Sequence, residues 1–251
     1  MDAPFIPHPS SLINSPGHLV VRDLGRMAYL PALQLQRQVH QRVLDQQSPQ
    51  TLLLVEHDPV ITLSGRRDVT QNLLANPQEL TALGIEVADT DRGGDITYHG
   101  PGQLVAYPII RLSPLGLNVG RYMRWLEQVA IDTVATFDVE AERIEGCTGV
   151  WIDASRRDGS TATRRMNKLC ALGVRVRKNV TMHGLALNVT TSLQHYRTIV
   201  PCGLVDKGIT TLQQLLGAGC PDMRSVKAEL GRQMQHHLGV LTDGRNVSPA
   251  V

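Results

Sequence analysis

Cys202 is the residue whose surroundings most suggest covalent chemistry. It lies between Pro201 and Gly203, in a tight, non-helical piece of backbone that can present a side chain. A thiol reacts as its thiolate, and a nearby cation favours the thiolate by lowering the pKa from about 8.5. Lys168, which opens an apolar segment, is one candidate cation. The alternatives are a cysteine packed as a small hydrophobe and a lysine solvated at a strand end.

The other cysteines and the histidines suggest less chemistry. Cys170 is flanked by apolar residues and is expected in the core, whereas Cys147 is compatible with either role. His183, in MHGLALN, is a second candidate partner for the thiol, or a structural histidine in a glycine turn. The nine histidines are scattered, and there is neither a C-x-x-C pair nor an H-E-x-x-H motif. We therefore expect no metal site.

Residues 92–103, RGGDITYHGPGQ, form a second chemically suggestive stretch, directly before the apolar LVAYPII. Its glycines and prolines exclude a helix, and glycine permits backbone approaches that a Cβ prevents. We expect a shaped loop whose backbone lies close to a ligand. A turn-rich hairpin with solvated polar residues is the alternative. The loop lacks G-x-x-x-x-G-K-[ST], and no G-x-G-x-x-G follows a strand, so a nucleotide phosphate site is not expected.

The composition is that of a globular protein with one large domain or two small ones. The chain has 251 residues, of which 42% are hydrophobic and 19% charged, enough to bury a core. Its net charge of +2 is too small to indicate nucleic acid binding. It shows neither a signal segment nor a run of about 18 apolar residues, so a soluble cytoplasmic protein without membrane association is expected.

Periodicity and turn residues indicate strands and helices mixed without a regular βαβ alternation. This favours an α+β protein, or a mixed sheet with helices to one side. Residues 1–17 are expected to be a flexible leader, and residues 154–166 an exposed loop or hairpin tip. We expect strands at 19–24, 51–63 (broken at Asp58-Pro59), 85–89, 102–110, 149–153, 168–176 and 180–189. We expect helices at 27–47, 77–83, from Asn118 to about 137, 192–196, 210–216 and 223–238.

Five motifs in order carry a resemblance to a known family. They are RGGDITYHGPGQLVAYPI from 92, GVW at 149–151, Lys168 with the Ala-Leu-Gly of 171–173, HGLALN at 183–188, and PCG at 201–203. Together they resemble the lipoate–protein ligase B family, the octanoyl-[acyl-carrier-protein]–protein N-octanoyltransferases. The resemblance covers about residues 19–240.

The resemblance implies the α/β domain of biotin and lipoate ligases, with a mixed, largely antiparallel sheet and flanking helices. It would be a single catalytic domain at 18–242, followed by a tail at 243–251. Cys202 would carry the acyl group as a thioester with Lys168 as its partner, and no cofactor is implied. The donor would be octanoyl-acyl carrier protein. The acceptors would be lipoyl domains of 2-oxoacid dehydrogenases and the glycine cleavage H protein. The implied substrate-binding residues are Arg92, Gly93, Gly94, Asp95, Ile96, Thr97, Tyr98, His99, Ala171, Leu172, Gly173, Gly184, Leu185 and Ala186.

Three functions compete at this point. The first is acyl transfer through Cys202 without ATP, the second is ATP-dependent ligation on the same fold, and the third is non-catalytic acyl binding. Because the protein partners are typically acidic in this setting, basic side chains are candidates for a docking surface, although they are equally compatible with ordinary solvated charges. These are Arg121, Arg124, Arg164, Arg165, Arg175, Arg177 and Lys178.

Overall fold

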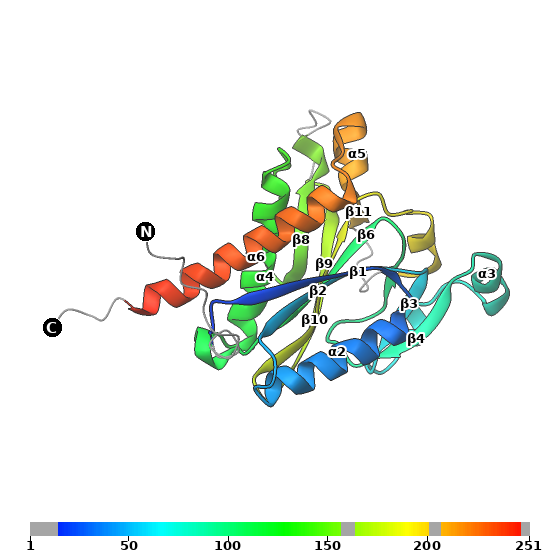
Figure 1. Ribbon diagram of the computed structural model, residues 1–251. Coiled ribbons are helices and arrows are strands. Elements are labelled where there is room, and N and C mark those ends of the chain that lie inside the picture. The colour runs from blue at the N-terminus through cyan, green and yellow to red at the C-terminus, as the bar shows by residue number, and fades with distance from the viewer. Residues whose placement is uncertain (1–14, 157–163, 201–206, 247–251) are drawn as a thin grey trace.

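The computed structural model describes residues 15–156, 164–200 and 207–246. In this part of the chain, two β-sheets pack against α-helices (Figure 1). The strands are β1 (Leu19–Met27), β2 (Gln50–His57), β3 (Val60–Ser64), β4 (Glu86–Thr90), β5 (Thr97–His99), β6 (Gln103–Ile109), β7 (Glu142–Ile144), β8 (Cys147–Asp153), β9 (Met166–Arg177), β10 (Val180–Asn188) and β11 (Gly208–Ile209). The helices are α2 (Tyr29–Leu44), α3 (Pro77–Ala82), α4 (Val119–Ala135), α5 (Leu212–Leu216) and α6 (Met223–Asn246).

The large sheet has the order β1-β2-β6-β10-β9-β8-β7, and β11 also pairs with β9. Only the β1–β2 and β9–β11 pairs in it are parallel. The small sheet has the order β4-β3-β5, with β3 parallel to β4 and antiparallel to β5. The expected mixed, largely antiparallel sheet with flanking helices is confirmed.

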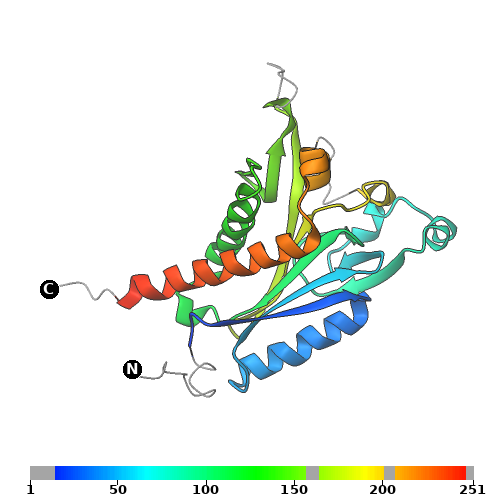
Figure 2. The ribbon, with the colours of Figure 1, turned by 45° about the horizontal axis from the view of Figure 1, so that its top comes forward.

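The large sheet is covered on both faces, which explains why its central strands are apolar throughout (Figure 2). Successive side chains of a strand point to opposite faces. Leu52 and Leu54 of β2 therefore pack with the side chains of α4 and α6, while Leu53 and Val55 pack with those of α2. This alternation is repeated along β6 and β10. The sheet is the middle layer of the domain.

Local sequence explains several element boundaries. The side chain of Asn76 accepts a 2.9 Å hydrogen bond from the N–H of Glu79, whose carboxylate accepts a 2.8 Å bond in return, forming a capping box at the start of α3. Gly84 follows with a φ of +64°. Lys178 and Asn179 have φ values of 48° and 62°, the left-handed conformation required by a tight β-hairpin between β9 and β10. The predicted break between the strands at 168–176 and 180–189 and the predicted helix at 77–83 are therefore confirmed.

Several elements differ from the sequence prediction. The short strands β5, β7 and β11 were not expected, because two or three residues carry no recognisable periodicity. A 3-10 helix occupies His195–Thr198 rather than 192–196, and α6 continues to Asn246 instead of ending near residue 238. The exposed loop predicted at 154–166 begins as a 3-10 helix at Ala154–Arg156. The predicted leader lies almost entirely outside the described residues.

Strand β1 is held between β2 and the last helix. The N–H of Leu19 donates a 3.0 Å hydrogen bond to the side chain of Gln235, which in turn donates to the carbonyl of Gly17. Lys227 contacts Asp23 at 2.9 Å. Two segments more than 200 positions apart are thus joined. Within the described ranges, no helix is long and apolar enough to cross a membrane.

Candidate active site

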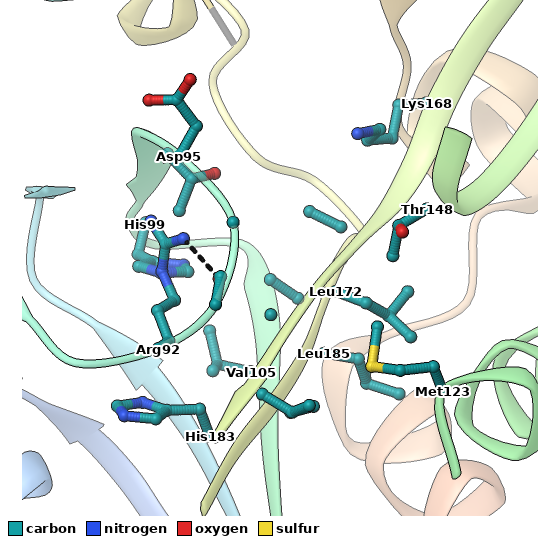
Figure 3. Close-up of a pocket in the computed structure, with 18 of the residues that line it drawn as sticks. Arg92, Asp95, His99, Val105, Met123, Thr148, Lys168, Leu172, His183 and Leu185 are labelled. Atoms are coloured by element: carbon teal, nitrogen blue, oxygen red, sulfur yellow. Dashed lines mark hydrogen bonds between the residues drawn. The ribbon is translucent and has the colours of Figure 1, made fainter. Parts of the chain in front are cut away.

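A cavity of about 460 Å³ lies where the loop between β4 and β5 meets strands β9 and β10. Its walls also receive residues from α4 and β6, so both sheets contribute. Figure 3 shows Lys168 toward one end, with Leu172, Leu185 and Met123 further along the wall. The cavity therefore combines an apolar wall with polar residues, among them Arg92, Asp95 and His99 (Figure 3).

Most of the substrate-binding residues implied by the sequence lie in this one cavity. The lining includes Arg92, Gly93, Gly94, Asp95, Thr97, His99, Lys168, Ala171, Leu172, Gly173, Gly184, Leu185 and Ala186. The fold thus brings together segments separated by more than 90 positions. Their role in binding substrate is a prediction that the geometry makes reasonable.

Ile96 and Tyr98 do not line the cavity. Because side chains alternate along an extended segment, Thr97 and His99 face the cavity while these two residues face away. Ile96 is fully buried in a separate apolar cluster, and the Tyr98 hydroxyl contacts His195 Nδ1 at 2.7 Å. The expectation that every residue of 92–99 touches substrate is therefore corrected for these two, which support the loop from behind.

Glycine is required at the wall because the backbones are in contact. A Cβ on Gly173 would lie 2.7 Å from the carbonyl oxygen of Gly93, and a Cβ on Gly184 would lie 2.2 Å from the carbonyl oxygen of Ala106. Real Cβ atoms do not approach that closely. The glycines in the motifs are therefore explained by close packing of loop against strand and of strand against strand.

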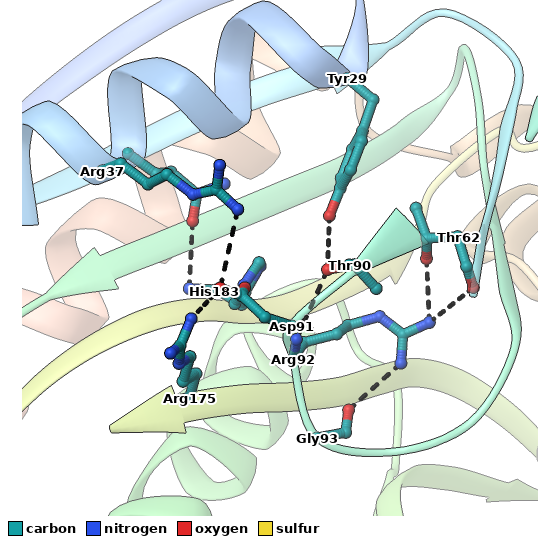
Figure 4. Close-up of polar contacts among 10 residues, drawn as sticks. Tyr29, Arg37, Thr62, Thr90, Asp91, Arg92, Gly93, Arg175 and His183 are labelled. Atoms are coloured by element: carbon teal, nitrogen blue, oxygen red, sulfur yellow. Dashed lines mark hydrogen bonds and ion pairs between the residues drawn. The ribbon is translucent and has the colours of Figure 1, made fainter. Parts of the chain in front are cut away.

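The side chain of Arg92 is folded back onto the protein (Figure 4). It donates to the carbonyl and hydroxyl oxygens of Thr62 at 3.0 and 2.9 Å, and to the Gly93 carbonyl at 3.2 Å. The small sheet and the loop are cross-linked by these bonds. Arg92 consequently shapes the loop as well as lining the cavity.

Asp91 organises a partly exposed polar cluster beside Arg92, which also includes the buried His183 (Figure 4). Its carboxylate contacts Arg175, lies 3.7 Å from Arg37, and accepts a 2.7 Å hydrogen bond from His183 Nε2. Burial and the neighbouring guanidinium groups lower the pKa of His183 to about 3. His183 is thus a neutral imidazole whose Nε2 carries the proton, in a backbone with a φ of 57°. This arrangement favours the structural interpretation of His183.

Two further neutral imidazoles lie at or behind the cavity floor. His99 Nδ1 contacts Gln103 Oε1 at 2.7 Å, and burial lowers its pKa to about 3. His57 Nδ1 contacts the Met27 carbonyl at 2.9 Å, its Nε2 contacts the Tyr107 hydroxyl at 2.7 Å, and burial lowers its pKa to about 4. Since carbonyl oxygens only accept, Nδ1 carries the proton in both rings. Nε2 is therefore the unprotonated nitrogen of the His99 ring.

Lys168 is the buried ammonium of the cavity. The residue is 8% exposed, and its Nζ lies 4.6 Å from the centre of the Trp151 ring. No carboxylate in the described part of the chain forms an ion pair with it. Cys170, two residues later, is fully buried, and burial raises its pKa to about 12. The core interpretation of Cys170 is therefore confirmed, and its thiol is protonated.

Cys202 lies outside the described residues, so its place relative to Lys168 stays a prediction. The sequence interpretation also missed several residues of the lining. These are Tyr29, Arg66, Val105, Tyr107, Val119, Met123, Gly146, Cys147, Thr148 and Val174. Most lie on ordinary apolar faces of helices and strands, which give no local signal of a cavity. For Cys147, the adjacent GVW motif was a usable signal.

Solved structures with this fold are lipoate and biotin protein ligases. A bipartite lipoate protein ligase from Thermoplasma acidophilum matches with a TM-score of 0.67 and 15% identity, over 88% of this chain and 85% of that chain. A biotin protein ligase from Aquifex aeolicus, in complex with biotin and ATP, matches with a TM-score of 0.52 and 11% identity, over 89% and 72%. The fold is thus that of a ligase-type catalytic domain.

Sequence relatives identify the family within this class of fold. Residues 28–235 match the lipoyl protein ligase A/B catalytic domain family. An octanoyltransferase of Chloroflexus aggregans is 45% identical over 81% of this chain and 87% of its own length. One from Bacteroides fragilis is 44% identical over 78% and 85%. The chain therefore belongs to the lipoyl protein ligase A/B catalytic domain family, and within it to the octanoyltransferases.

Proposed function

We propose that this octanoyltransferase takes its acyl group from octanoyl-acyl carrier protein and holds it as a thioester on Cys202. The acyl group then passes to a lysine ε-amine of a lipoyl domain, as part of protein lipoylation. The observation that carries the proposal is a cavity with an apolar wall and the buried ammonium of Lys168 among its lining. The acceptors are lipoyl domains of 2-oxoacid dehydrogenases and the glycine cleavage H protein.

The apolar part of the cavity suits the acyl tail. Val105, Leu172, Leu185 and Met123 supply the walls, and the tail has seven carbons beyond the carbonyl. Burial of each CH₂ stabilises the complex by about 0.8 kcal/mol, so the whole tail supplies several kcal/mol. A cavity of about 460 Å³ is within the range of small-molecule sites.

The first step exchanges one thioester for another. The Cys202 thiolate attacks the donor carbonyl, a new C–S bond forms, and the bond to the carrier sulfur breaks. The Lys168 ammonium supplies the proton that the departing thiolate requires. Since one thioester replaces another, this step is nearly balanced in free energy.

The second step makes the amide. Lys168, now neutral, takes one proton from the incoming ammonium, and the resulting amine attacks the Cys202 thioester. The C–N bond forms, Cys202 leaves as thiolate, and the second amine proton passes to solvent. Amide formation from a thioester is downhill, so ATP is not required. One proton is released for each turnover.

Intact-mass measurement separates this mechanism from its alternatives. The protein is incubated with octanoyl-carrier protein in the absence of ATP. We expect an added octanoyl group that survives denaturation, is released by hydroxylamine and is absent from Cys202→Ala. Cys220→Ala, which changes another free thiol, is the matched control and should still be acylated. A wild type without adduct, or an adduct that persists in Cys202→Ala, contradicts the proposal.

The lysine is tested in the same assay. Lys168→Ala should acylate more slowly, and its Cys202 should react with an alkylating agent only at higher pH. Lys178→Asn is the matched control, since it removes a lysine from the exposed hairpin turn and asparagine tolerates the positive φ found there. ATP-dependent ligation would instead show no acylation without ATP and full activity in Cys202→Ala.

A further inference from the structure

We infer that Trp151 is a positioning residue for Lys168, holding its ammonium over the indole face so that it reaches into the cavity without an ion pair to any carboxylate of the described residues. The inference rests on the proposed role of Lys168 as proton carrier. Trp151 would determine where the Lys168 ammonium lies.

The geometry makes Trp151 a direct support for the lysine. Trp151 pairs with Lys168 across the antiparallel strands β8 and β9, and paired residues project from the same face. The Lys168 Nζ lies 4.6 Å from the ring centre, within the distance at which a cation is attracted to an aromatic face. Trp151 is 0% exposed, so this attraction is not weakened by water.

Gly149 bounds the lysine side chain from a second direction. A Cβ on Gly149 would lie 3.2 Å from Lys168 Cε and 2.9 Å from the carbonyl oxygen of Cys170. Gly149 also has a φ of +129°, which a residue with a side chain rarely adopts. The lysine stem is therefore close to a glycine backbone as well as to the indole.

The indole ring is itself fixed. Its Nε1–H donates a 3.2 Å hydrogen bond to the carbonyl of Cys147. The N–H of Gly149 donates at 3.1 Å to the carboxylate of Glu127, and Glu127 is held by Arg124 and Arg143 at 2.8 and 3.1 Å. Trp151 thus lies in a strand that is hydrogen-bonded to α4.

An aromatic face suits a proton carrier for a chemical reason. It attracts the ammonium form but takes no proton, so Lys168 can still give a proton to a leaving thiolate. A carboxylate in the same place would form a hydrogen-bonded ion pair and hold the proton. Among the described residues, the titratable or charged groups near Lys168 are Cys147 and Asp95 in the cavity, Cys170 on β9, Lys207 before β11, Glu127 and Arg124 on α4, and Arg143 on β7. Glu127 is occupied by the two arginines.

The position of Lys168 can be tested without measuring activity. The chain has four lysines, so protein labelled with ¹³C at lysine Cε gives four assignable signals, and Lys168→Arg identifies one of them. Protons above an indole face resonate upfield. We expect the Lys168 Hε protons upfield of the other three lysines, and at an ordinary position in Trp151→Leu. In Trp125→Phe, which alters the other tryptophan, the upfield position should persist.

Kinetic measurements then test whether Trp151 positions Lys168. Single-turnover acylation of Cys202 should slow about 10²-fold in Trp151→Leu, since misplacing a reacting group costs about that much. The pH at which the acylation rate is half-maximal should also move, and KM for the carrier protein should stay within about twofold. In Trp151→Phe, the Lys168 Hε protons should be displaced upfield by a smaller amount, and the acylation rate should be intermediate. This variant tests the inference if Trp151→Leu does not fold. Trp125→Phe should match wild type.

The outcomes separate the two proposals. If the Lys168 protons lie at an ordinary position in wild type, or if Trp151→Leu and Trp151→Phe acylate at the wild-type rate while Lys168→Ala is slow, the inference is overturned. If the upfield signal depends on Trp151 but Lys168→Ala acylates normally, the geometry holds and the proposed function of Lys168 fails.

Discussion

The amide of Gly93 donates a 2.8 Å hydrogen bond to the carbonyl of Val174. This bond ties the loop between β4 and β5 to strand β9 beside the point where Gly173 meets the same loop. The small sheet and the large sheet are thereby joined across one wall of the cavity. The shape of the acyl site depends on that junction.

Gly173→Ala should open the junction. Its Cβ would lie 2.7 Å from the Gly93 carbonyl oxygen and 3.1 Å from Arg92 Cδ, so the loop must move away from β9. We expect the free energy of unfolding to fall by about 1–3 kcal/mol and KM for the octanoyl donor to rise. Urea unfolding and steady-state kinetics measure both.

The matched control is Gly239→Ala, in helix α6, where a Cβ would meet nothing within 4 Å. It should stabilise the protein by up to about 1 kcal/mol, through helix propensity, and leave KM unchanged. A Gly173→Ala protein with wild-type stability and KM would show that the junction does not shape the site.

Met123→Ala should change the preference for acyl chain length. Met123 lies in the apolar wall contributed by α4 (Figure 3), and its removal makes room for further CH₂ groups. Because each buried CH₂ contributes about 0.8 kcal/mol, the ratio of decanoyl to octanoyl kcat/KM should rise by up to about tenfold. Met234→Ala, in the core of α6, should lower stability without altering that ratio. An unchanged ratio in both variants would place Met123 outside the acyl path.

Acid should destabilise the protein through its buried imidazoles. His57, His99 and His183 have pKa values of about 4, 3 and 3 in the folded protein, below the unfolded value of about 6.5. Between those values the unfolded chain binds more protons, so the free energy of unfolding falls as pH decreases below about 6.5. Each histidine contributes about 1.4 kcal/mol per pH unit.

Urea unfolding between pH 7 and pH 5 measures this effect. The slope should steepen as pH falls and approach at least three protons near pH 5, because His40, whose pKa is also lowered by burial, adds to the three. Any carboxylate contribution enters at lower pH. His57→Gln should reduce the slope by about one proton, whatever its effect on stability at pH 7. A flat profile from pH 7 to pH 5 would mean that these imidazoles are accessible to protons in the folded state.

Carrier-protein turnover should fall with ionic strength if basic residues guide docking. The candidates cannot act as one patch, because Arg177 ends β9 while Arg164 lies two residues before its start, and the two ends of β9 are about 36 Å apart by strand geometry. Arg124, Arg164 and Arg175 are also already paired with carboxylates. Arg121, exposed on α4 near the cavity residues Val119 and Met123, is the best-placed candidate.

Arg121→Gln should therefore lower kcat/KM for the carrier protein by a few fold and reduce its salt dependence. Arg42→Gln, an exposed change at the end of α2, should do neither. A wild-type rate constant that is independent of salt would remove electrostatic docking from the mechanism.

The sequence predicted features that depend on local chemistry. Asn76-Pro77 at the start of α3 and the turn before Val180 are examples, since capping and positive φ are properties of a few adjacent residues. Features that depend on packing were missed. Nothing local distinguishes Met123 from a core methionine, or shows that Tyr98 faces away from the cavity while His99 faces it.

The junction of Leu19 with Gln235 has a consequence for biosynthesis. The edge strand β1 emerges from the ribosome well before helix α6, whose side chains contact it. β1 is the last strand of its sheet and presents one unpaired edge, the type of surface that recruits other chains, and until α6 is made it lacks these side-chain contacts. The contacts between β1 and α6 thus form only after α6 has been made. A nascent chain stalled before Met223 would be a natural client for a chaperone that binds exposed strands.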